Sequence, residues 1–230
     1  MLHTTLTLLR NIPVTLTPDQ LDARKLVQLP SLLHQAVVGM LLGDAGAYRT
    51  SPSQTSNTRL EWSFGKNRQE FAMYVASLMA LYHNTPVTAL QVLAGGILHT
   101  SYRLKTVALP LFNYYRDLFY VYDPATGKYR KVVPANILEL ITPISLAHLI
   151  MGDGNFDANR NRVRIYTNGF TRSDNDRLAA AITANLGIEV GVMHDRAGQY
   201  ILTIGALQLE TLRKLVGPHM HPSMTYRIGL

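Results

Sequence analysis

The sequence contains no cysteine in its 230 residues, which excludes disulfide bonds and any zinc site with thiolate ligands. Any metal ion must therefore bind oxygen or imidazole ligands, and oxygen ligands suit Mg²⁺ or Ca²⁺. The sequence also lacks a long apolar run. The longest candidates, such as residues 37–42, are interrupted by glycine or charge well before the roughly 18 residues that a membrane span needs. No membrane partner is expected.

Acidic residues are few. Fifteen Asp and Glu stand against 22 Lys and Arg, so the formal net charge is +7. This excess favours a polyanionic partner, and nucleic acid is the first candidate. The first 18 residues contain one arginine, whereas an organelle transit peptide has several, so we interpret this segment as an extension of the fold.

An internal repeat is the main feature of the chain. Residues 34–46 read HQAVVGMLLGDAG and residues 145–154 read SLAHLIMGDG, so each copy is an apolar helical run that ends in an acidic, glycine-rich turn. The acidic residues are Asp44 and Asp153. An isolated Gly-Asp-Gly is most often a simple turn, but its duplication favours a functional role.

Each copy is followed by an alternating pattern, in residues 58–64 and 162–167, that is typical of a half-buried strand. The inward positions are Leu60, Trp62, Phe64, Val163 and Ile165. Helical patterns come next, at residues 67–82 and 173–186. The repeating unit therefore begins with a helix, continues with strands and returns to a helix.

A second hairpin is expected in each half. It would pair residues 97–107 with 114–122 in the first half, and residues 189–193 with 199–204 in the second. Residues 123–134 have the proline, glycine and charges of a connector. We therefore place a domain boundary near residue 140, which divides the chain into residues 1–140 and 141–230.

The repeated segments resemble the LAGLIDADG homing endonucleases in their single-chain form with two motifs. Residues 37–45 (VVGMLLGDA) and 146–154 (LAHLIMGDG) fit the family motif, with Asp44 and Asp153 at its acidic position. Further family-like segments follow in family order: TSNTRLEWS at 55–63, RKVVP at 130–134, ITPISLAHLIMGDGNFD at 141–157, TNGFT at 167–171 and HPSMTYR at 221–227. The resemblance covers residues 32–228.

The resemblance implies an α+β fold of two pseudo-two-fold halves, each αββαββα. Two motif helices would lie at the centre, and antiparallel sheets would form a DNA-binding saddle. The sequence departs from the motif at Ala45, where the family has glycine, and at His148, where it has a small residue. The second departure bears on how tightly the motif helices pack.

Small residues on the two motif helices predict close packing between them. They are Ala36, Gly39 and Gly43 on one helix, and Ser145 and Gly152, with Leu149 between them, on the other. Such packing brings Asp44 and Asp153 together at the helix C-termini, where like charge and the helix dipole both disfavour carboxylates. A divalent cation relieves both penalties, and Mg²⁺ also accepts phosphate oxygens. The pair therefore predicts a site for phosphodiester hydrolysis.

The resemblance implies further residues for this site. The backbone carbonyls before the two aspartates, at Gly43 and Gly152, would also face the metal. A basic residue near each scissile phosphate falls on Lys131 and on Arg227, where an arginine replaces the commoner lysine. Arginine keeps the positive charge but cannot lose its proton, so it would only stabilise charge. The expected catalytic residues are Asp44, Asp153, Lys131 and Arg227.

The polar faces of the strands are expected to contact DNA, because alternate side chains of a β-ribbon meet base edges in the major groove. The strand candidates are Arg59, Glu61, Ser63, Arg103, Lys105, Arg162, Arg164, Tyr166, Gln199 and Thr203. Loop candidates for contacts at the rims are Arg49, Gln54, Lys66, Asn161, His194 and Arg196. In contrast, we interpret His219 and His221 as part of a structural turn rather than as metal ligands.

The resemblance implies a monomeric endonuclease that makes double-strand breaks with short 3′ overhangs in a long DNA target. Mg²⁺ would be its cofactor, with Mn²⁺ as a substitute and Ca²⁺ as a non-productive one. One alternative is a maturase that binds group I intron RNA on the same fold. Another is a non-cutting DNA-binding regulator, which the presence of both acidic residues disfavours. Family members of this kind are typically encoded in organelle introns, so a mitochondrial or chloroplast location is expected.

Overall fold

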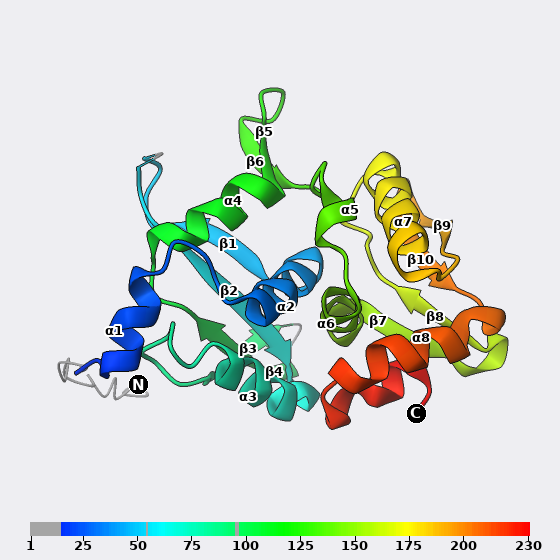
Figure 1. The fold of residues 1–230 in the computed structure, drawn as a ribbon, viewed down its shortest axis with the longest axis horizontal. Coiled ribbons are helices and arrows are strands. Elements are labelled where there is room, and N and C mark those ends of the chain that lie inside the picture. The colour runs from blue at the N-terminus through cyan, green and yellow to red at the C-terminus, as the bar shows by residue number, and fades with distance from the viewer. Residues whose placement is uncertain (1–14, 54, 95–96) are drawn as a thin grey trace.

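The computed structural model describes residues 15–53, 55–94 and 97–230 (Figure 1). Most of the N-terminal segment that the sequence assigns to an extension of the fold lies outside the described residues. Within the described part, no helix is long and apolar enough to cross a membrane.

The same order of elements occurs twice along the chain (Figure 1). The first copy consists of α2 (Ser31–Leu42), β1 (Gly46–Arg49), β2 (Thr58–Gly65), α3 (Gln69–Leu78), β3 (Thr88–Ala94), β4 (Ile97–Lys105) and α4 (Asn113–Phe119). The second consists of α6 (Pro143–Asp153), β7 (Gly154–Asp157), β8 (Arg162–Ile165), α7 (Arg172–Leu186), β9 (Gly191–Arg196), β10 (Gln199–Ile204) and α8 (Leu209–Val216). The predicted α+β class with duplicated αββαββα halves is confirmed.

Further α-helices and β-strands lie outside the two copies. Helix α1 (Pro18–Lys25) precedes the first copy, and β5 (Tyr120–Asp123), β6 (Lys128–Lys131) and α5 (Ile137–Leu140) lie between the copies. The stretch predicted as a plain connector thus contains the second strand of a hairpin, because residues 128–131 pair with residues 120–123. The domain boundary near residue 140 remains a prediction.

Each half contains one four-stranded antiparallel sheet, with strand orders β1-β2-β4-β3 and β7-β8-β10-β9. In the view of Figure 1 the helices lie in front of the sheets, and α2 and α6 lie side by side at the centre. The inward positions predicted for β2 and β8 are all buried, Trp62 included. The alternation of apolar residues therefore identified the face of each strand that packs on the helices.

The second hairpin of the first half was predicted wrongly. Strand β4 pairs with β3, and residues 113–119 form helix α4 instead of a strand. In this aromatic-rich segment Phe112, Tyr115 and Phe119 are the buried positions, a spacing that matches a helix period rather than a strand period. The corresponding hairpin of the second half, β9–β10, is confirmed.

Helices α2 and α6 touch backbone to backbone at Gly39. A Cβ atom placed there would lie 2.1 Å from the carbonyl oxygen of Ser145 and 2.9 Å from Cβ of His148. His148 is buried: its Nδ1 donates to the carbonyl of Ile144 (2.8 Å), which leaves Nε2 to accept from the hydroxyl of Tyr74 (3.3 Å). Burial lowers the pKa of His148 to about 4, so this residue fits into the helix interface as a neutral ring.

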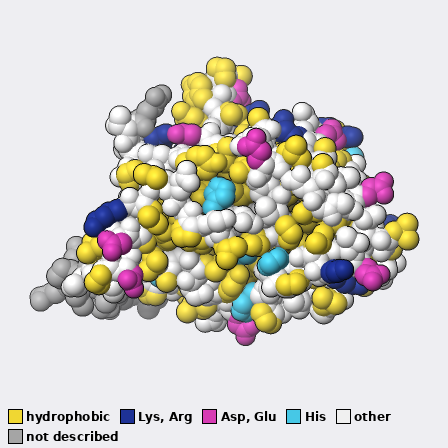
Figure 2. Space-filling model, viewed as in Figure 1, with side chains coloured by type: hydrophobic (Ala, Val, Ile, Leu, Met, Phe, Trp, Pro, Cys, Tyr) yellow, Lys and Arg dark blue, Asp and Glu magenta, His cyan; other side chains and the backbone are white. Residues whose placement is uncertain are grey.

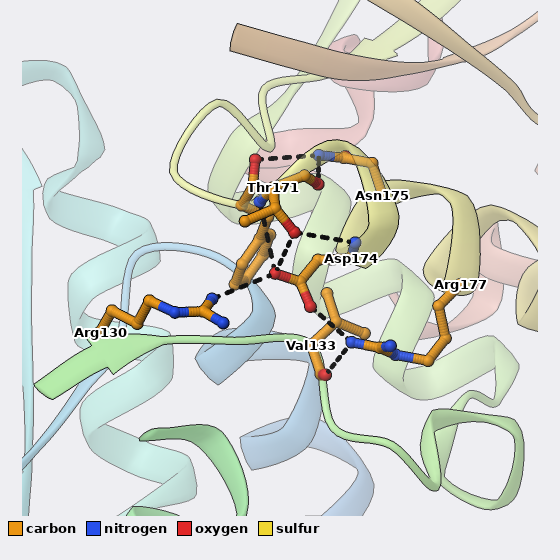
Figure 3. Close-up of polar contacts among 7 residues, drawn as sticks. Arg130, Val133, Thr171, Asp174, Asn175 and Arg177 are labelled. Atoms are coloured by element: carbon orange, nitrogen blue, oxygen red, sulfur yellow. Dashed lines mark hydrogen bonds and ion pairs between the residues drawn. The ribbon is translucent and has the colours of Figure 1, made fainter. Parts of the chain in front are cut away.

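The segment after β6 is held by the second half (Figure 3). Asp174 is buried at the N-terminus of α7 and forms a capping box with Thr171. Arg177 pairs with Asp174 and donates to the carbonyl of Val133 (2.9 Å), while Arg130 lies 3.6 Å from the Asp174 carboxylate. Strand β6 is therefore braced against α7 on one side and the first half on the other.

Candidate active site

The C-terminal ends of α2 and α6 bring Asp44 and Asp153 together. The two side chains lie close enough for Asp44 to perturb the Asp153 carboxyl group. A Cβ atom at Gly43 would lie 3.2 Å from Oδ2 of Asp153, and one at Gly152 would lie 3.6 Å from the backbone nitrogen of Asp44. Asp44 is exposed and Asp153 is half-buried, so the pair can be reached from solvent. A Cβ at Gly43 would therefore crowd the Asp153 carboxylate, whereas one at Gly152 would make only ordinary contacts.

The Asp153 carboxyl group is strongly perturbed. Burial and the charge of Asp44 raise its pKa to about 7, against the opposing effect of Lys131 and Arg68. Two carboxylates in contact cannot both ionise at low cost. A positive charge close to the two carboxylates would therefore stabilise the pair.

Lys131 supplies one positive charge beside the pair. Its Nζ donates to the carbonyl oxygens of Gly43 (2.7 Å) and Ala45 (2.7 Å), so it reaches one of the two carbonyls expected to face a metal. Burial lowers the pKa of Lys131 to about 8, while the nearby carboxylates of Asp153 and Asp44 favour its charged form. A lysine in this state can both stabilise charge and exchange a proton near neutral pH.

Arg68, which the sequence reasoning missed, binds the opposite side of the pair. Its Nη1 donates to Oδ2 of Asp44 (2.8 Å) and to the carbonyl oxygen of Gly152 (3.0 Å). The residue lies at the end of a short 3₁₀ helix between β2 and α3. It stands in a polar KNRQE stretch and far from either motif, so no local signal separates it from an ordinary solvated arginine.

Arg227 lies behind the second motif. It is buried, donates from Nη1 to the carbonyl of Gly154, and its guanidinium lies 5.5 Å from the ring centroid of Tyr226. Burial and the charge of Arg68 lower its pKa. Its buried Nε atom has no hydrogen-bond partner within the described residues. Arg68 and Lys131 thus lie beside the two carboxyl groups, whereas Arg227 binds the backbone just after Asp153.

The donor set fits a hard divalent cation. Two carboxylates and the carbonyls of Gly43 and Gly152 offer only oxygen, and no group of three or more His, Asp or Glu ligands occurs in residues 15–53, 55–94 and 97–230. A cation here would complete its coordination with water or phosphate oxygens, as Mg²⁺ does. The ammonium of Lys131 and the guanidinium of Arg68 already bind three of these oxygens, which shows that the oxygens attract positive charge.

In the first sheet, the predicted DNA-contacting residues share one face. In the β2–β4 register Glu61 is opposite Lys105 and Ser63 is opposite Arg103. Arg59 is two residues before Glu61 on β2 and therefore lies on the same face. All five are at least partly accessible to solvent. Arg59 and Glu61 form an ion pair with each other, which a DNA contact would have to rearrange.

In the second sheet, Arg164 is opposite Thr203, and Arg162 and Arg164 both lie near Asp157, at 3.1 Å and 3.6 Å. Nη2 of Arg162 and Nε of Arg164 are buried and lack hydrogen-bond partners within the described residues. Each of these two arginines therefore has one N–H donor that forms no hydrogen bond within the described residues. Tyr166 is exposed just after β8, and Gln199 is half-buried at the start of β10.

Several loop assignments need correction. Arg49 ends β1 and pairs with Asp117 (2.9 Å), and His194 and Arg196 lie within β9. His194 is opposite Tyr200 in the β9–β10 register. The Tyr200 ring lies 5.3 Å from the Arg172 guanidinium of α7. His194 is therefore on the face of the sheet that packs against α7, and Thr203 is on the other face. Cross-strand partners always share a face, which explains the difference.

The loop candidates Lys66 and Asn161 are accessible to solvent. Lys66 begins a 3₁₀ helix and Asn161 ends another in a left-handed conformation. Gln54 lies outside the described residues. On the side of the molecule seen in Figure 2, Lys and Arg lie mainly toward the edges, and hydrophobic and uncharged side chains cover the centre.

His221 caps the 3₁₀ helix Pro222–Ile228. Its Nδ1 accepts from the backbone nitrogen of Ser223 (3.3 Å), and its ring packs 4.9 Å from that of Tyr74. The structural role of the turn with His219 and His221 stays a prediction.

Comparison with known families decides the classification. A model described as the LAGLIDADG DNA endonuclease family matches residues 34–212, which include both motifs and most of both sheets. The chain belongs to this family. The predicted family resemblance is thereby confirmed.

LAGLIDADG relatives match at low identity over long stretches. Cytochrome b mRNA maturase bI2 of Debaryomyces hansenii is 27% identical over 201 residues, which are 85% of this chain and 72% of that protein. A probable intron-encoded DNA endonuclease 3 of Mycosarcoma maydis is 24% identical over 129 residues, 56% of this chain and 93% of that protein.

Two solved LAGLIDADG structures share the fold. The homing endonuclease I-WcaI bound to its DNA recognition sequence aligns with a TM-score of 0.78 at 19% identity, covering 90% of both chains. I-DmoI in complex with DNA and Mn aligns with a TM-score of 0.51 at 17% identity, covering 83% of this chain and 99% of that one. These likenesses establish the two-half architecture.

Proposed function

We propose that this LAGLIDADG protein is a site-specific homing endonuclease that hydrolyses both strands of a long DNA target and leaves short 3′ overhangs. The observation that carries the proposal is the closeness of the Asp44 and Asp153 carboxyl groups at the ends of α2 and α6, with Lys131 and Arg68 beside them. The DNA-bound state of the similar I-WcaI and I-DmoI structures supports duplex DNA as the partner.

In this proposal Asp44 and Asp153 hold divalent cations, together with the carbonyls of Gly43 and Gly152. Bound cations supply Lewis-acid stabilisation of the attacking water and of the leaving oxygen. Lys131 and Arg227 stabilise the negative charge of the phosphate in the transition state, and Lys131 can also transfer a proton. The polar faces of the sheets position the duplex. We propose Mg²⁺ as the native ion, and the Mn in the I-DmoI complex supports a divalent metal.

The test is cleavage of duplexes from a randomised library, and of the exon junction that flanks the reading frame, in the presence of Mg²⁺. We expect both strands to be cut, short 3′ overhangs on sequencing of the ends, no cutting in EDTA, and binding without cutting in Ca²⁺. If no duplex is cut in Mg²⁺ or Mn²⁺, the endonuclease proposal fails.

A maturase is the second candidate, and the 27% identity to a cytochrome b mRNA maturase favours it specifically. Tight, saturable binding of the host intron RNA in a filter assay, with faster splicing, would establish that function. A single chain supplies both aspartates, so we propose a monomer of two halves divided near residue 140. One relative is named as an intron-encoded endonuclease. This name supports an organellar origin for the chain, which we include in the proposal.

Arg68 should compete with the metal, because it covers Asp44 Oδ2 and the Gly152 carbonyl oxygen. We expect the Arg68→Met variant to bind Mn²⁺ about tenfold more tightly than the parent chain in the absence of DNA. In the parent chain the Arg68 guanidinium must first leave the oxygen atoms that would bind the ion, and in the variant it is absent. Electron paramagnetic resonance of free Mn²⁺ measures this affinity. Arg172→Met, which removes an exposed arginine paired with Asp176, is the matched control. Unchanged or weaker Mn²⁺ binding in the Arg68 variant would contradict this role.

A further inference from the structure

The β5–β6 hairpin projects beyond the body of the molecule, as Figure 1 shows at the top of the view. Its turn is well organised. Gly127 donates its backbone N–H to the carbonyl of Asp123 (2.9 Å), while the Asp123 carboxylate accepts from the backbone nitrogen of Ala125 (3.0 Å) and the hydroxyl of Thr126 (3.0 Å). Gly127 has a φ of +67°, which the turn requires. The hairpin therefore presents its side chains from a defined scaffold.

One face of this hairpin is continuous with the candidate active site. The register pairs Tyr120 with Lys131 and Tyr122 with Tyr129, so these four side chains share a face. At its base, Lys131 binds the carbonyls of Gly43 and Ala45, and the Tyr120 hydroxyl accepts from the backbone nitrogen of Ala47 (3.2 Å). Toward the tip, the same face carries the two remaining tyrosines.

Arg116 of α4 adds a positive charge to this face. Its guanidinium lies 4.1 Å from the ring centroid of Tyr120 and 4.5 Å from that of Tyr129, and it donates to the carbonyl of Ala47 (3.2 Å). On the opposite face, Arg130 lies 3.6 Å from Asp174 of the second half (Figure 3). The hairpin is thus held from both sides and surrounded by cations, as a surface for a polyanion would be.

The tip tyrosines are solvent-exposed and lack polar partners. Tyr122 is 56% exposed and Tyr129 is 50% exposed, and neither hydroxyl forms a hydrogen bond within the residues that the structure describes. Their rings meet edge to face, with centroids 5.4 Å apart, and Arg116 covers one face of Tyr129. Arg116 therefore occupies one face of Tyr129, and both hydroxyl donors are free for phosphate oxygens.

We propose that the β5–β6 hairpin is a third DNA-contacting element, separate from the two sheets, whose Tyr122 and Tyr129 hydroxyls bind backbone phosphates of the duplex beside the cleavage centre. This inference rests on the proposed endonuclease function. Duplex DNA is favoured over single-stranded RNA because the same face of the hairpin leads to Lys131, which lies at the proposed site of duplex cleavage. The contact would also position Lys131, which lies two residues beyond Tyr129 on the same face.

The test removes the hydroxyls and keeps the rings. Tyr122→Phe/Tyr129→Phe should bind a long mixed-sequence duplex in Ca²⁺ about tenfold more weakly than the parent chain, since two hydrogen bonds to charged oxygens are lost. Tyr114→Phe is the matched control, because Tyr114 is 48% exposed on α4 and packs beside His34 and Tyr115 instead. On a selected target, hydroxyl-radical footprinting should show loss of protection beside the cleavage centre and unchanged protection over the sheets.

Each outcome separates this inference from the proposed function. If the double variant binds duplex DNA as tightly as the parent and the Tyr114→Phe control, the hairpin contact is overturned, whereas cleavage by the parent chain still supports the endonuclease. If only binding of group I intron RNA weakens, the hairpin is an RNA surface and the inference is again overturned. If the parent chain binds DNA but never cuts, the proposed function fails while weakened DNA binding by the double variant still supports the contact.

Discussion

Replacement of either motif aspartate, as Asp44→Asn or Asp153→Asn, is expected to abolish double-strand cleavage, with the rate falling by about a thousandfold or more. Asparagine preserves the size of the side chain but removes the negative charge that would hold a divalent cation. Binding should change little, because the sheet faces proposed to meet the duplex are untouched. Single-turnover cleavage in Mg²⁺ measures the first effect, and fluorescence anisotropy without divalent metal measures the second.

The matched control for both variants is Asp176→Asn on the exposed surface of α7, where the carboxylate pairs with Arg172. This variant should cut like the parent chain. Cleavage of both strands at the parental rate by either motif variant would remove Asp44 or Asp153 from the catalytic site. Loss of DNA binding in the same variant would instead point to damage of the fold.

The second large effect is expected on stability. Gly39→Ala should lower the free energy of unfolding by about 3 kcal/mol, because the added Cβ would lie 2.1 Å from the carbonyl oxygen of Ser145. The neighbouring atom belongs to the backbone of α6, so the clash is relieved only if the two helices move apart. For a chain of this length we expect the Tm to fall by roughly 6 to 12 °C. Thermal unfolding followed by circular dichroism gives the measurement.

Gly65→Ala is the control for this substitution. Gly65 ends β2 with a φ of −67°, and no atom lies within 4 Å of a Cβ placed there. Its replacement should change stability by less than about 0.5 kcal/mol. A Gly39→Ala variant as stable as the Gly65→Ala variant would show that α2 and α6 are not in backbone contact. A destabilised but folded Gly39→Ala variant should also cut more slowly, since the separation of the helices separates Asp44 from Asp153.

Local sequence patterns predicted most of the secondary structure, because buried residues recur with the spacing that is typical of a helix or of a strand. The alternation at Leu60, Trp62 and Phe64 located strand β2 and its core face. The prediction failed for residues 113–119, where a high content of tyrosine and phenylalanine favoured a strand. Side-chain type is a weaker guide than spacing, and here the buried positions follow a helical period.

Interactions between distant segments could not be predicted in the same way. Arg68 reaches Asp44 Oδ2 and the Gly152 carbonyl oxygen because β2 and α3 place it beside the helix ends. Its neighbours in the sequence are polar and contain no sign of this contact. His194 illustrates the same limit, since the strand register alone decided that it faces α7.

The sequence by itself determined the family, the duplicated order of elements and the two acidic positions, because a repeated motif and periodic burial are local properties of the chain. Only the tertiary structure decided which cations surround the carboxylates, how closely the helices approach at Gly39, and where the β5–β6 hairpin presents its tyrosines. Those features depend on distances between residues far apart along the chain. Such distances follow from packing and strand register, which no local pattern encodes.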